Sequence, residues 1–228
     1  KEYRRQRQMC IRDSSIGTKR GGLGIHKYCD YLIFSFQAIK TITTGDGGFL
    51  GIKDNDLLSK AKRLRWFGID RDSKQRGIWQ NDITEIGYKY QLSDLNAAVG
   101  LANLLEVDDI LEHRREIMSI YEHNIKTPLI SKYYGVKDDI SIQECGAWLY
   151  TIRTAHRHEL MRYLRERNVE SAQVHYRNDR YSIFAPYKNH CPNMDAVEDQ
   201  YLVLPLHTRM SADDAMYICK ILNEFNPI

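Results

Sequence analysis

The stretch that decides the fold reads Ser35-Phe36-Gln37-Ala38-Ile39-Lys40-Thr41-Ile42-Thr43-Thr44-Gly45-Asp46-Gly47-Gly48. It begins inside an apolar and aromatic run, residues 31–36, which predicts a strand buried on both faces, as in parallel sheets. Its glycine-rich end predicts a turn, and residues 49–52 predict a second short strand. We therefore expect an α/β fold in which this stretch connects two strands.

Lys40 is the residue of this stretch whose side chain is best suited to catalysis. It stands between Ile39 and Ile42, after a buried strand and before a turn, so the backbone delivers its amine into a restricted site. Desolvation there favours the neutral amine, which can attack a carbonyl group. Ser35, at the end of the strand, can donate a hydrogen bond to a phosphate. A lysine beside glycines also occurs in solvated surface loops, so spacing alone leaves both interpretations open.

Helical periodicity follows the second strand. The expected helices begin at Asp54 or Asn55, at Ser93, and at Asp108 or Asp109. Gly68 ends the first of them. The third mixes apolar and basic positions, which suggests a long connector between two domains. Because the helical pattern stops around Pro128, we place the domain boundary near residue 125.

The rest of the chain alternates between strands and helices. The expected elements are a strand at 147–152, a helix at 158–167 and a strand at 172–176. A last helix begins at Ser211, with Asp214 completing a variant capping box. We expect 15–125 to be part of a large domain and 126–228 to be a small α+β domain.

Composition excludes several classes of protein. The formal charge of +3 is concentrated in the first 20 residues, so the rest of the chain lacks the basic character of a nucleic-acid-binding domain. No apolar run approaches the roughly 20 residues that span a membrane, and no secretory signal is visible, so we expect a cytoplasmic protein. Five cysteines without a Cys-x-x-Cys pair argue against a disulfide framework or a zinc site. The histidines lack metal-ligand spacing, so we expect no metal.

Several segments together resemble one family. They are the Ser-Phe-(three residues)-Lys-(three residues)-Thr-Gly-Asp-Gly-Gly pattern of 35–48, the Arg-x-x-Gly-x-x-Arg pattern of 65–71, the Gly-Tyr-x-Tyr-x-Leu-Ser-Asp-x-x-Ala-Ala pattern of 87–98, and the segments 174–179 and 204–207. This sequence is similar to the DegT/DnrJ/StrS family of pyridoxal-phosphate-dependent nucleotide-sugar aminotransferases over about residues 17–225.

The resemblance implies a fold and a reaction. The fold is part of an aspartate-aminotransferase-like (type I) three-layer large domain, followed by a small α+β domain. Lys40 would bind pyridoxal 5'-phosphate covalently and move a proton, and Ser35 would bond the cofactor phosphate. The reaction would move an amino group from an amino acid, glutamate by expectation, to a keto group of a nucleotide-linked sugar. A dehydratase branch carries histidine in place of this lysine, so Lys40 favours transamination.

The resemblance implies roles for other positions, where the match to the family is less specific. In the family's homodimers, an Asn of the 88–91 loop reaches the partner's cofactor phosphate; here Gln91 or Lys89 would replace it. That loop could equally serve only to cap the helix that begins at Ser93. His175, Arg177 and Asn178 are candidates for binding the phosphates of the nucleotide sugar, because guanidinium forks suit phosphate oxygens. A structural role is the alternative for each of them.

The resemblance also implies that this sequence is the C-terminal piece of a longer protein. The acid that protonates the cofactor ring and most of the phosphate cup lie upstream of the lysine in the family. Asp13 is spaced like that acid, but the residues after it differ from the family pattern, and we expect 1–14 to be non-native. We therefore expect the piece alone to be inactive. The alternatives to an aminotransferase are a dehydratase or a non-catalytic regulatory or binding homologue on the same fold.

Overall fold

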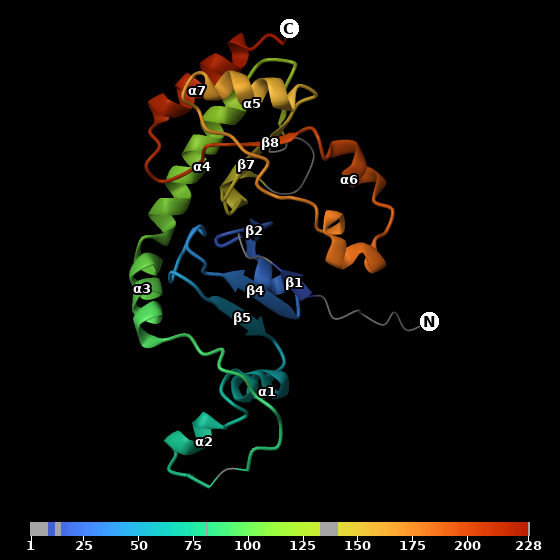
Figure 1. Cartoon of the computed structure of the whole chain (residues 1–228). Helices are drawn as coiled ribbons and strands as arrows, with labels where there is room; N and C mark the ends of the chain where they lie inside the picture. Colours follow the sequence, from blue (N-terminus) through green and yellow to red (C-terminus); the bar gives the residue numbers. More distant parts are fainter. Residues whose placement is uncertain (1–8, 12–14, 81, 133–140, 228) are drawn as a thin grey trace. The chain divides into compact units, whose positions relative to one another are not determined.

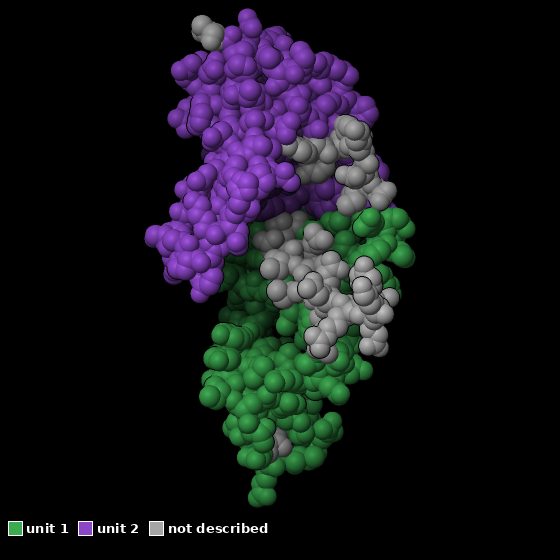
Figure 2. All heavy atoms as spheres, turned by 90° about the vertical axis from the view of Figure 1, so that its right-hand side faces the viewer, with its two compact units in different colours: residues 1–108 green, residues 109–228 purple. Residues whose placement is uncertain are grey.

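The computed structural model describes residues 9–11, 15–80, 82–132 and 141–227 (Figure 1). The chain forms two compact units, residues 1–108 (unit 1) and 109–228 (unit 2), coloured separately in Figure 2. Within the described ranges, no helix combines the length and the apolar character that a membrane crossing requires. Asp13 lies outside the described residues, as does the rest of the segment 1–14 except Met9–Ile11.

Unit 1 is built on a three-stranded sheet. Its strands are β1 (Met9–Ile11), β4 (Tyr31–Ser35) and β5 (Gly48–Ile52), in the order β1-β4-β5. The central strand β4 runs parallel to β1 and antiparallel to β5, with Ser35 opposite Gly48. Both strands predicted around Lys40 are confirmed. The apolar run resembles strands of parallel sheets, and β4 does run parallel to β1; its pairing with β5 is antiparallel because the loop after Ser35 folds back, with Phe36 bonded to Gly47.

The burial expected for β4 is corrected. Within this strand Leu32 is buried, and the other positions are half-buried. In the described part of unit 1, the buried apolar cluster at this sheet consists of Leu32 and Cys29, with Ile25 and Phe34 packed against it. Alternation of apolar residues could indicate a strand, but it could not indicate how much of this chain covers the strand's faces.

The other elements of unit 1 lie between or after the strands of this sheet along the chain. They are β2 (Lys19–Arg20), β3 (Leu23–Gly24), the 3₁₀-helix η1 (Ile25–Tyr28), α1 (Asn55–Arg65), α2 (Arg71–Gln75) and α3 (Asp94–Leu105). The predicted caps are confirmed. The Asp54 carboxylate accepts hydrogen bonds from two backbone N–H groups of α1, and the Ser93 hydroxyl accepts one from Asn96 at the start of α3.

Unit 2 has an antiparallel sheet and a substantial core. Its elements are α4 (Val107–Asn124), β6 (Ser131–Lys132), η2 (Ile142–Glu144), β7 (Tyr150–Arg153), α5 (Arg157–Arg165), η3 (Asn178–Arg180), η4 (Ser182–Tyr187), α6 (Pro192–Val197), β8 (Tyr201–Leu204) and α7 (Ala212–Glu224). The sheet order is β6-β7-β8. The core lies between this sheet and helices α4, α5 and α7, which Figure 1 shows gathered around β7 and β8. The predicted capping box of Ser211 and Asp214 at the start of α7 is confirmed.

Two sequence expectations for unit 2 can be compared with the structure. The compact units divide between Asp108 and Asp109, whereas the sequence predicted a domain boundary near residue 125; Ile117, Met118 and Tyr121 of α4 are fully buried in the core of unit 2. The strand expected at 172–176 is wrong, since only Ala172 pairs with β8, in an isolated bridge to Val203. The backbone φ of Val174 is 59°, which ends the extended conformation there.

Candidate active site

Lys40 lies in a loop that closes on itself. The N–H of Phe36 donates to the carbonyl of Gly47 at 2.9 Å, and the N–H of Thr44 donates to the carbonyl of Phe36 at 3.0 Å. Within this closed loop, the N–H of Lys40 donates to the carbonyl of Gln37 at 2.9 Å, which forms a single turn. The Lys40 side chain is half-buried. The loop therefore fixes the backbone of Lys40 through main-chain bonds near its two ends and at its middle.

Ser35 lies next to two positions of this loop that require glycine. A Cβ atom at Gly48 would lie 2.9 Å from the carbonyl oxygen of Phe34, and Gly47 has a φ of 146°, so both positions require glycine. Ser35 Oγ accepts a hydrogen bond from the N–H of Gln37 at 3.3 Å. A hydroxyl that accepts one bond keeps its own proton for donation. Ser35 Oγ therefore has a proton left to donate, and its role as a phosphate donor stays a prediction.

Helix α3 holds the Lys40 loop in place. Asn96 Nδ2 donates to the carbonyl of Asp46 at 3.2 Å, and Asn103 Nδ2 donates to the carbonyl of Thr43 at 3.1 Å. Between them Gly100 lies against Thr44, where a Cβ atom would come within 2.6 Å of the threonine methyl carbon. These three residues were not among those predicted for the site. Their signal was present, because positions 96, 100 and 103 share one face of a helix.

The donor set of the loop fits the cofactor that the resemblance implies. Lys40 supplies an amine that can bond to a carbonyl carbon, and Ser35 supplies a donor for a phosphate oxygen. The Thr41 hydroxyl next to the lysine is buried and has no hydrogen-bond partner among the described residues. A buried hydroxyl without a partner is costly unless something bonds to it, so this atom points to a polar group bound beside Lys40.

The structure brings the second predicted region together from two segments. The N–H of Phe67 donates to the carbonyl of Tyr88 at 3.1 Å, and Trp66 and Lys89 form an isolated β-bridge. Lys89 Nζ lies 3.8 Å from the centre of the Trp66 ring, and Arg71 lies over the same ring at 5.1 Å. These two segments were noted separately in the sequence.

Gln91 completes this arrangement. Its Oε1 accepts a hydrogen bond from Arg71 Nη1 at 2.7 Å. We call Trp66, Arg71, Lys89 and Gln91 the Trp66 cluster. It contains both residues that could replace the family's Asn, together with a second cation, Arg71. The cluster therefore combines an amide with positive charge, and such donors suit the oxygens of a phosphate.

Two glycines allow these segments to meet. A Cβ atom at Gly87 would lie 1.9 Å from the backbone nitrogen of Gly68. Gly68 itself has a φ of 77°, and a Cβ there would lie 2.3 Å from the carbonyl oxygen of Glu85. The two backbones therefore touch directly, and any side chain at Gly87 would force them apart.

In unit 2, His175 lies beside an aromatic ring. The rings of His175 and Trp148 are 5.8 Å apart, and the carbonyl of His175 accepts a hydrogen bond from the Tyr201 hydroxyl. His175 is exposed, and Asn178 is exposed at the start of η3. Both residues are thus exposed, and their role in binding the substrate stays a prediction.

Arg177 differs from its two neighbours. Its side chain is 5% exposed and its guanidinium bonds three carboxylates: Asp179 through two parallel hydrogen bonds of 2.8 and 2.6 Å, Asp195, and Glu198 at 3.0 Å. Hydrogen bonds from Arg177 hold the pKa values of Asp179 and Asp195 below their usual range. The carboxylates that surround Arg177 leave no positive charge to offer a phosphate, so the geometry favours the structural alternative for this residue.

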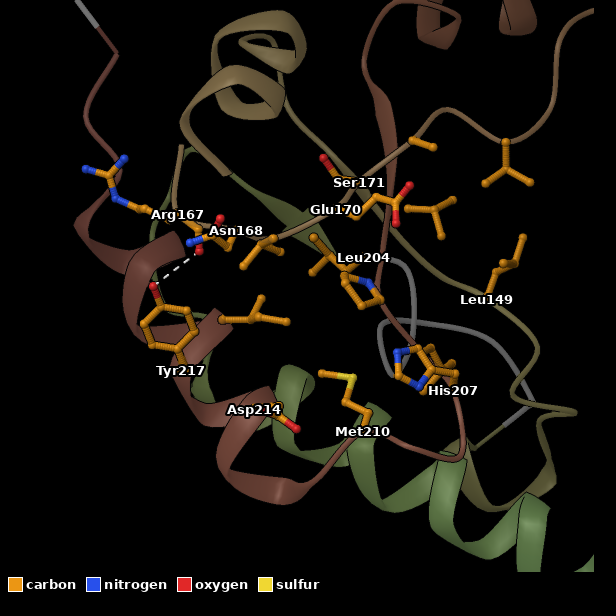
Figure 3. Close-up of a pocket in the computed structure, with 17 residues that line it drawn as sticks. Leu149, Arg167, Asn168, Glu170, Ser171, Leu204, His207, Met210, Asp214 and Tyr217 are labelled. Carbon is orange, nitrogen blue, oxygen red and sulfur yellow. Dashed lines mark hydrogen bonds between the residues drawn. The ribbon is translucent and has the colours of Figure 1, made fainter. Parts of the chain in front are cut away.

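A cavity of about 760 Å³ lies elsewhere in unit 2 (Figure 3). It is bounded by β8, α7 and the segment after α5, with Leu204 and Met210 among its apolar residues and His207 at its side. His207 belongs to the Leu-Pro-Leu-His segment noted in the sequence. None of the predicted site residues lines this cavity, so we do not assign the site to it. Among the described residues, no group of three or more His, Cys, Asp or Glu side chains could hold a metal ion.

Comparison with known proteins decides the family. The profile of the DegT/DnrJ/EryC1/StrS aminotransferase family matches residues 9–223. The chain belongs to this family. GDP-perosamine synthase of Escherichia coli O157:H7 is 31% identical over 215 residues, which cover 92% of this chain and 56% of that protein. The chain spans just over half the length of this curated relative.

Solved structures of other proteins confirm the fold. The sugar aminotransferase CalS13 from Micromonospora echinospora matches 96% of this chain and 59% of its own, with a TM-score of 0.87 and 27% identity. The putative sugar aminotransferase Spr1654 from Streptococcus pneumoniae, solved in its PLP form, matches 93% of this chain and 55% of its own, with a TM-score of 0.80 and 22% identity. The α/β, type I aminotransferase fold predicted from the sequence is therefore confirmed over this part.

Proposed function

We propose that this chain is the lysine-bearing part of an enzyme that transfers an amino group from an amino acid, with glutamate as the expected donor, to a keto group of a nucleotide-linked sugar. The observation that carries the proposal is the placement of Lys40 in a closed loop that also holds the buried Thr41 hydroxyl and begins directly after Ser35. Membership of the sugar aminotransferase family supports the reaction class, and a relative named for a GDP-linked sugar supports the substrate class.

The residues of the loop take distinct roles in this proposal. Pyridoxal 5'-phosphate, when bound, would supply the electron sink for the reaction. Lys40 Nζ would hold the cofactor covalently and, once released from it, carry a proton to and from the reacting carbon. Ser35 Oγ would donate to the phosphate. Asn96 and Asn103 would keep the loop on α3 while the lysine changes its bonding.

The Trp66 cluster takes a role in an assembly of two chains. We propose a homodimer in which Gln91, or Lys89 beside it, reaches the cofactor phosphate of the partner subunit. Arg71 supports this assignment because its hydrogen bond to Gln91 orients the amide and adds positive charge. On the substrate side, His175 and Asn178 would contact the nucleotide sugar. Cytoplasmic location and inactivity of the 228-residue piece alone are part of the same proposal.

The alternatives from the sequence are a dehydratase and a non-catalytic homologue. Lysine at position 40, where the dehydratase branch has histidine, favours transamination. The buried Thr41 hydroxyl without a described partner favours a bound polar group over an empty scaffold.

The test compares three versions of the full-length protein that carries this chain: wild type, Lys40→Ala and Lys53→Ala. Lys53 is a matched lysine of unit 1, exposed and bonded to the carbonyl of Lys27. After loading with the cofactor, wild type and Lys53→Ala are expected to show its protein-bound visible absorbance and to aminate a keto sugar. Lys40→Ala is expected to lose both, with turnover reduced by about 10³-fold or more, as for loss of a covalent catalytic group. Equal turnover in Lys40→Ala and wild type would contradict the proposal.

A further inference from the structure

A strained turn precedes His175. Val174 has a φ of 59°, a conformation that is a genuine outlier for a β-branched residue. The N–H of His175 donates to the carbonyl of Gln173 at 2.7 Å, which closes a three-residue turn around Val174. Backbone strain of this kind persists only where surrounding contacts hold it, and it concentrates at ligand-binding sites.

Contacts on both sides of Val174 hold this turn. Before it, Gln173 Nε2 donates to the Tyr201 hydroxyl at 2.9 Å and to the carbonyl of Glu198 at 3.2 Å. After it, the Tyr201 hydroxyl donates to the carbonyl of His175. The turn is thus fixed to the first residue of β8 and to the residue that ends α6.

Arg177 fixes the chain that leaves the turn. Its guanidinium bonds Asp179 on η3, Asp195 on α6 and the Glu198 side chain, and Arg180 bonds the same Glu198 carboxylate at 2.6 Å. Glu198 therefore accepts hydrogen bonds from Gln173 at its backbone carbonyl and from Arg177 at its carboxylate. The two flanks of the strained residue converge on one glutamate, which makes the position of His175 depend on Arg177.

The partner ring of His175 is held in a similar way. Ala147, just before Trp148, has a φ of 48°. Arg114 Nη1 donates to the carbonyls of Ala147 and Trp148, at 3.2 Å each. Two strained non-glycine residues, Ala147 and Val174, each stand directly before one of the two paired rings. This arrangement is expected where the rings themselves must be precisely placed.

We propose that Arg177 is a positioning residue: it holds the Val174 turn so that His175 and Trp148 together present one contact surface to the sugar substrate. The assignment of His175 to the substrate side rests on the proposed function. The dependence of the His175–Trp148 arrangement on Arg177 does not.

The first experiment reads the arrangement without any turnover. In the 228-residue chain with Trp66→Phe and Trp79→Phe, Trp148 is the remaining tryptophan. Arg177→Gln is expected to raise acrylamide quenching of Trp148 about twofold and chymotryptic cleavage after Tyr181 and Tyr187 about tenfold, because cleavage follows the population of the opened segment. Arg177→Lys is expected to fall between, since it keeps the charge and loses the fork.

The control for this experiment is Arg63→Gln, which removes another arginine–carboxylate pair, with Glu85 in unit 1. It is expected to leave both readouts at their wild-type values. Glu198→Gln serves as a second route to the same opening if Arg177→Gln does not fold. Unchanged quenching and cleavage in folded Arg177→Gln and Glu198→Gln would overturn the proposal.

The second experiment uses the full-length protein. Arg177→Lys is expected to raise KM for the sugar substrate about tenfold, with cofactor absorbance and kcat close to wild type, as for loss of a binding contact. Opening of the segment without a rise in KM would overturn the substrate part of the proposal. A wild-type protein without aminotransferase turnover would instead contradict the proposed function, and the quenching result would still decide the positioning role.

Discussion

Lys40 owes its placement to its neighbours. Its amine is delivered by a loop whose ends are joined by backbone hydrogen bonds and whose outer part is held by two asparagines of α3. The sequence motif identified Lys40 and Ser35 because their types and spacing are local properties. Asn96 and Asn103 escaped notice because their partners are 50 and 60 residues away in the chain. A side chain's hydrogen bond to a distant backbone carbonyl leaves no local pattern.

Arg177 and Gln91 also have contacts that the sequence could not indicate. Its residue type made Arg177 a candidate for binding phosphate. The three carboxylates around it come from positions up to 21 residues later in the chain. Gln91 was one of two substitutes for a missing Asn, and the structure adds Arg71 to it through a hydrogen bond that the sequence could not indicate. The motifs identified the candidate site residues, and they did not identify the contacts that support those residues.

The carboxylates around Arg177 give unit 2 an acid-dependent contribution to stability. Hydrogen bonds from Arg177 lower the pKa values of Asp179 and Asp195 from 3.8, and those from Arg180 and Arg177 lower that of Glu198 from 4.5. Because the folded values lie below the unfolded ones, this stability is fully present above pH 4.5. It is lost as the pH falls below about 4, through the folded values.

The measurement is the urea midpoint of unit 2, followed by Trp148 fluorescence between pH 6 and pH 3 in the Trp66→Phe, Trp79→Phe background. Asp179→Asn is expected to lower the midpoint at pH 6 and to reduce its fall between pH 4 and pH 3. Asp213→Asn, an exposed acid in the first turn of α7, is the control. An Asp179→Asn variant with the same pH profile as wild type would refute this account.

At the scale of single elements, helix ends were the most predictable features. Asp54, Ser93 and Ser211 each accept hydrogen bonds from the first turn of the helix they precede, as their positions in the sequence indicated. Capping works because the partners lie within three residues of each other. Strand pairing was less predictable: the direction of β5 depends on how the loop 36–47 folds back, and the missing strand at 172–176 depends on the turn at Val174.

The cap of α7 provides a test at this scale. Ser211→Ala removes the hydroxyl that accepts the N–H of Asp214 at 3.1 Å, in a helix that supplies Ala215, Ile218 and Leu222 to the core. The variant is expected to lose about 1 kcal/mol in the free energy of unfolding. Urea denaturation followed by far-UV circular dichroism measures it. Lys220→Ala, on the exposed side of the same helix, should change the free energy by less than about 0.5 kcal/mol.

At the scale of the whole molecule, the two units have unequal cores. The described residues give unit 2 a large buried cluster, which includes Tyr121, Leu160 and Leu222 at 0% exposure. In unit 1, large apolar side chains are exposed on the sheet and along α3, among them Phe49 at 52% and Leu105 at 88%. Burial of apolar surface is the main source of stability, so unit 1 of this chain should be the weaker one.

We therefore expect the 228-residue chain to unfold in two steps in urea. Hydrogen–deuterium exchange read by mass spectrometry should show α1 and α3 exchanging at lower urea than α5 and α7. Leu160→Ala, which empties a fully buried position, should destabilise the second step by about 2–5 kcal/mol and leave the first unchanged. A single transition at which all four helices exchange together would show that the units are not unequal in this way.

The direct contact between Gly87 and Gly68 has a consequence for how this protein can change over time. The two backbones meet without a side chain between them, and even a methyl group at Gly87 would overlap with Gly68. A lineage could replace Gln91 or Lys89 and so retune the Trp66 cluster, since the contacts of those side chains are with Arg71 and the Trp66 ring. It could not drift at Gly87 by single steps. Positions 89 and 91 of this loop are thus open to substitution, whereas position 87 is not.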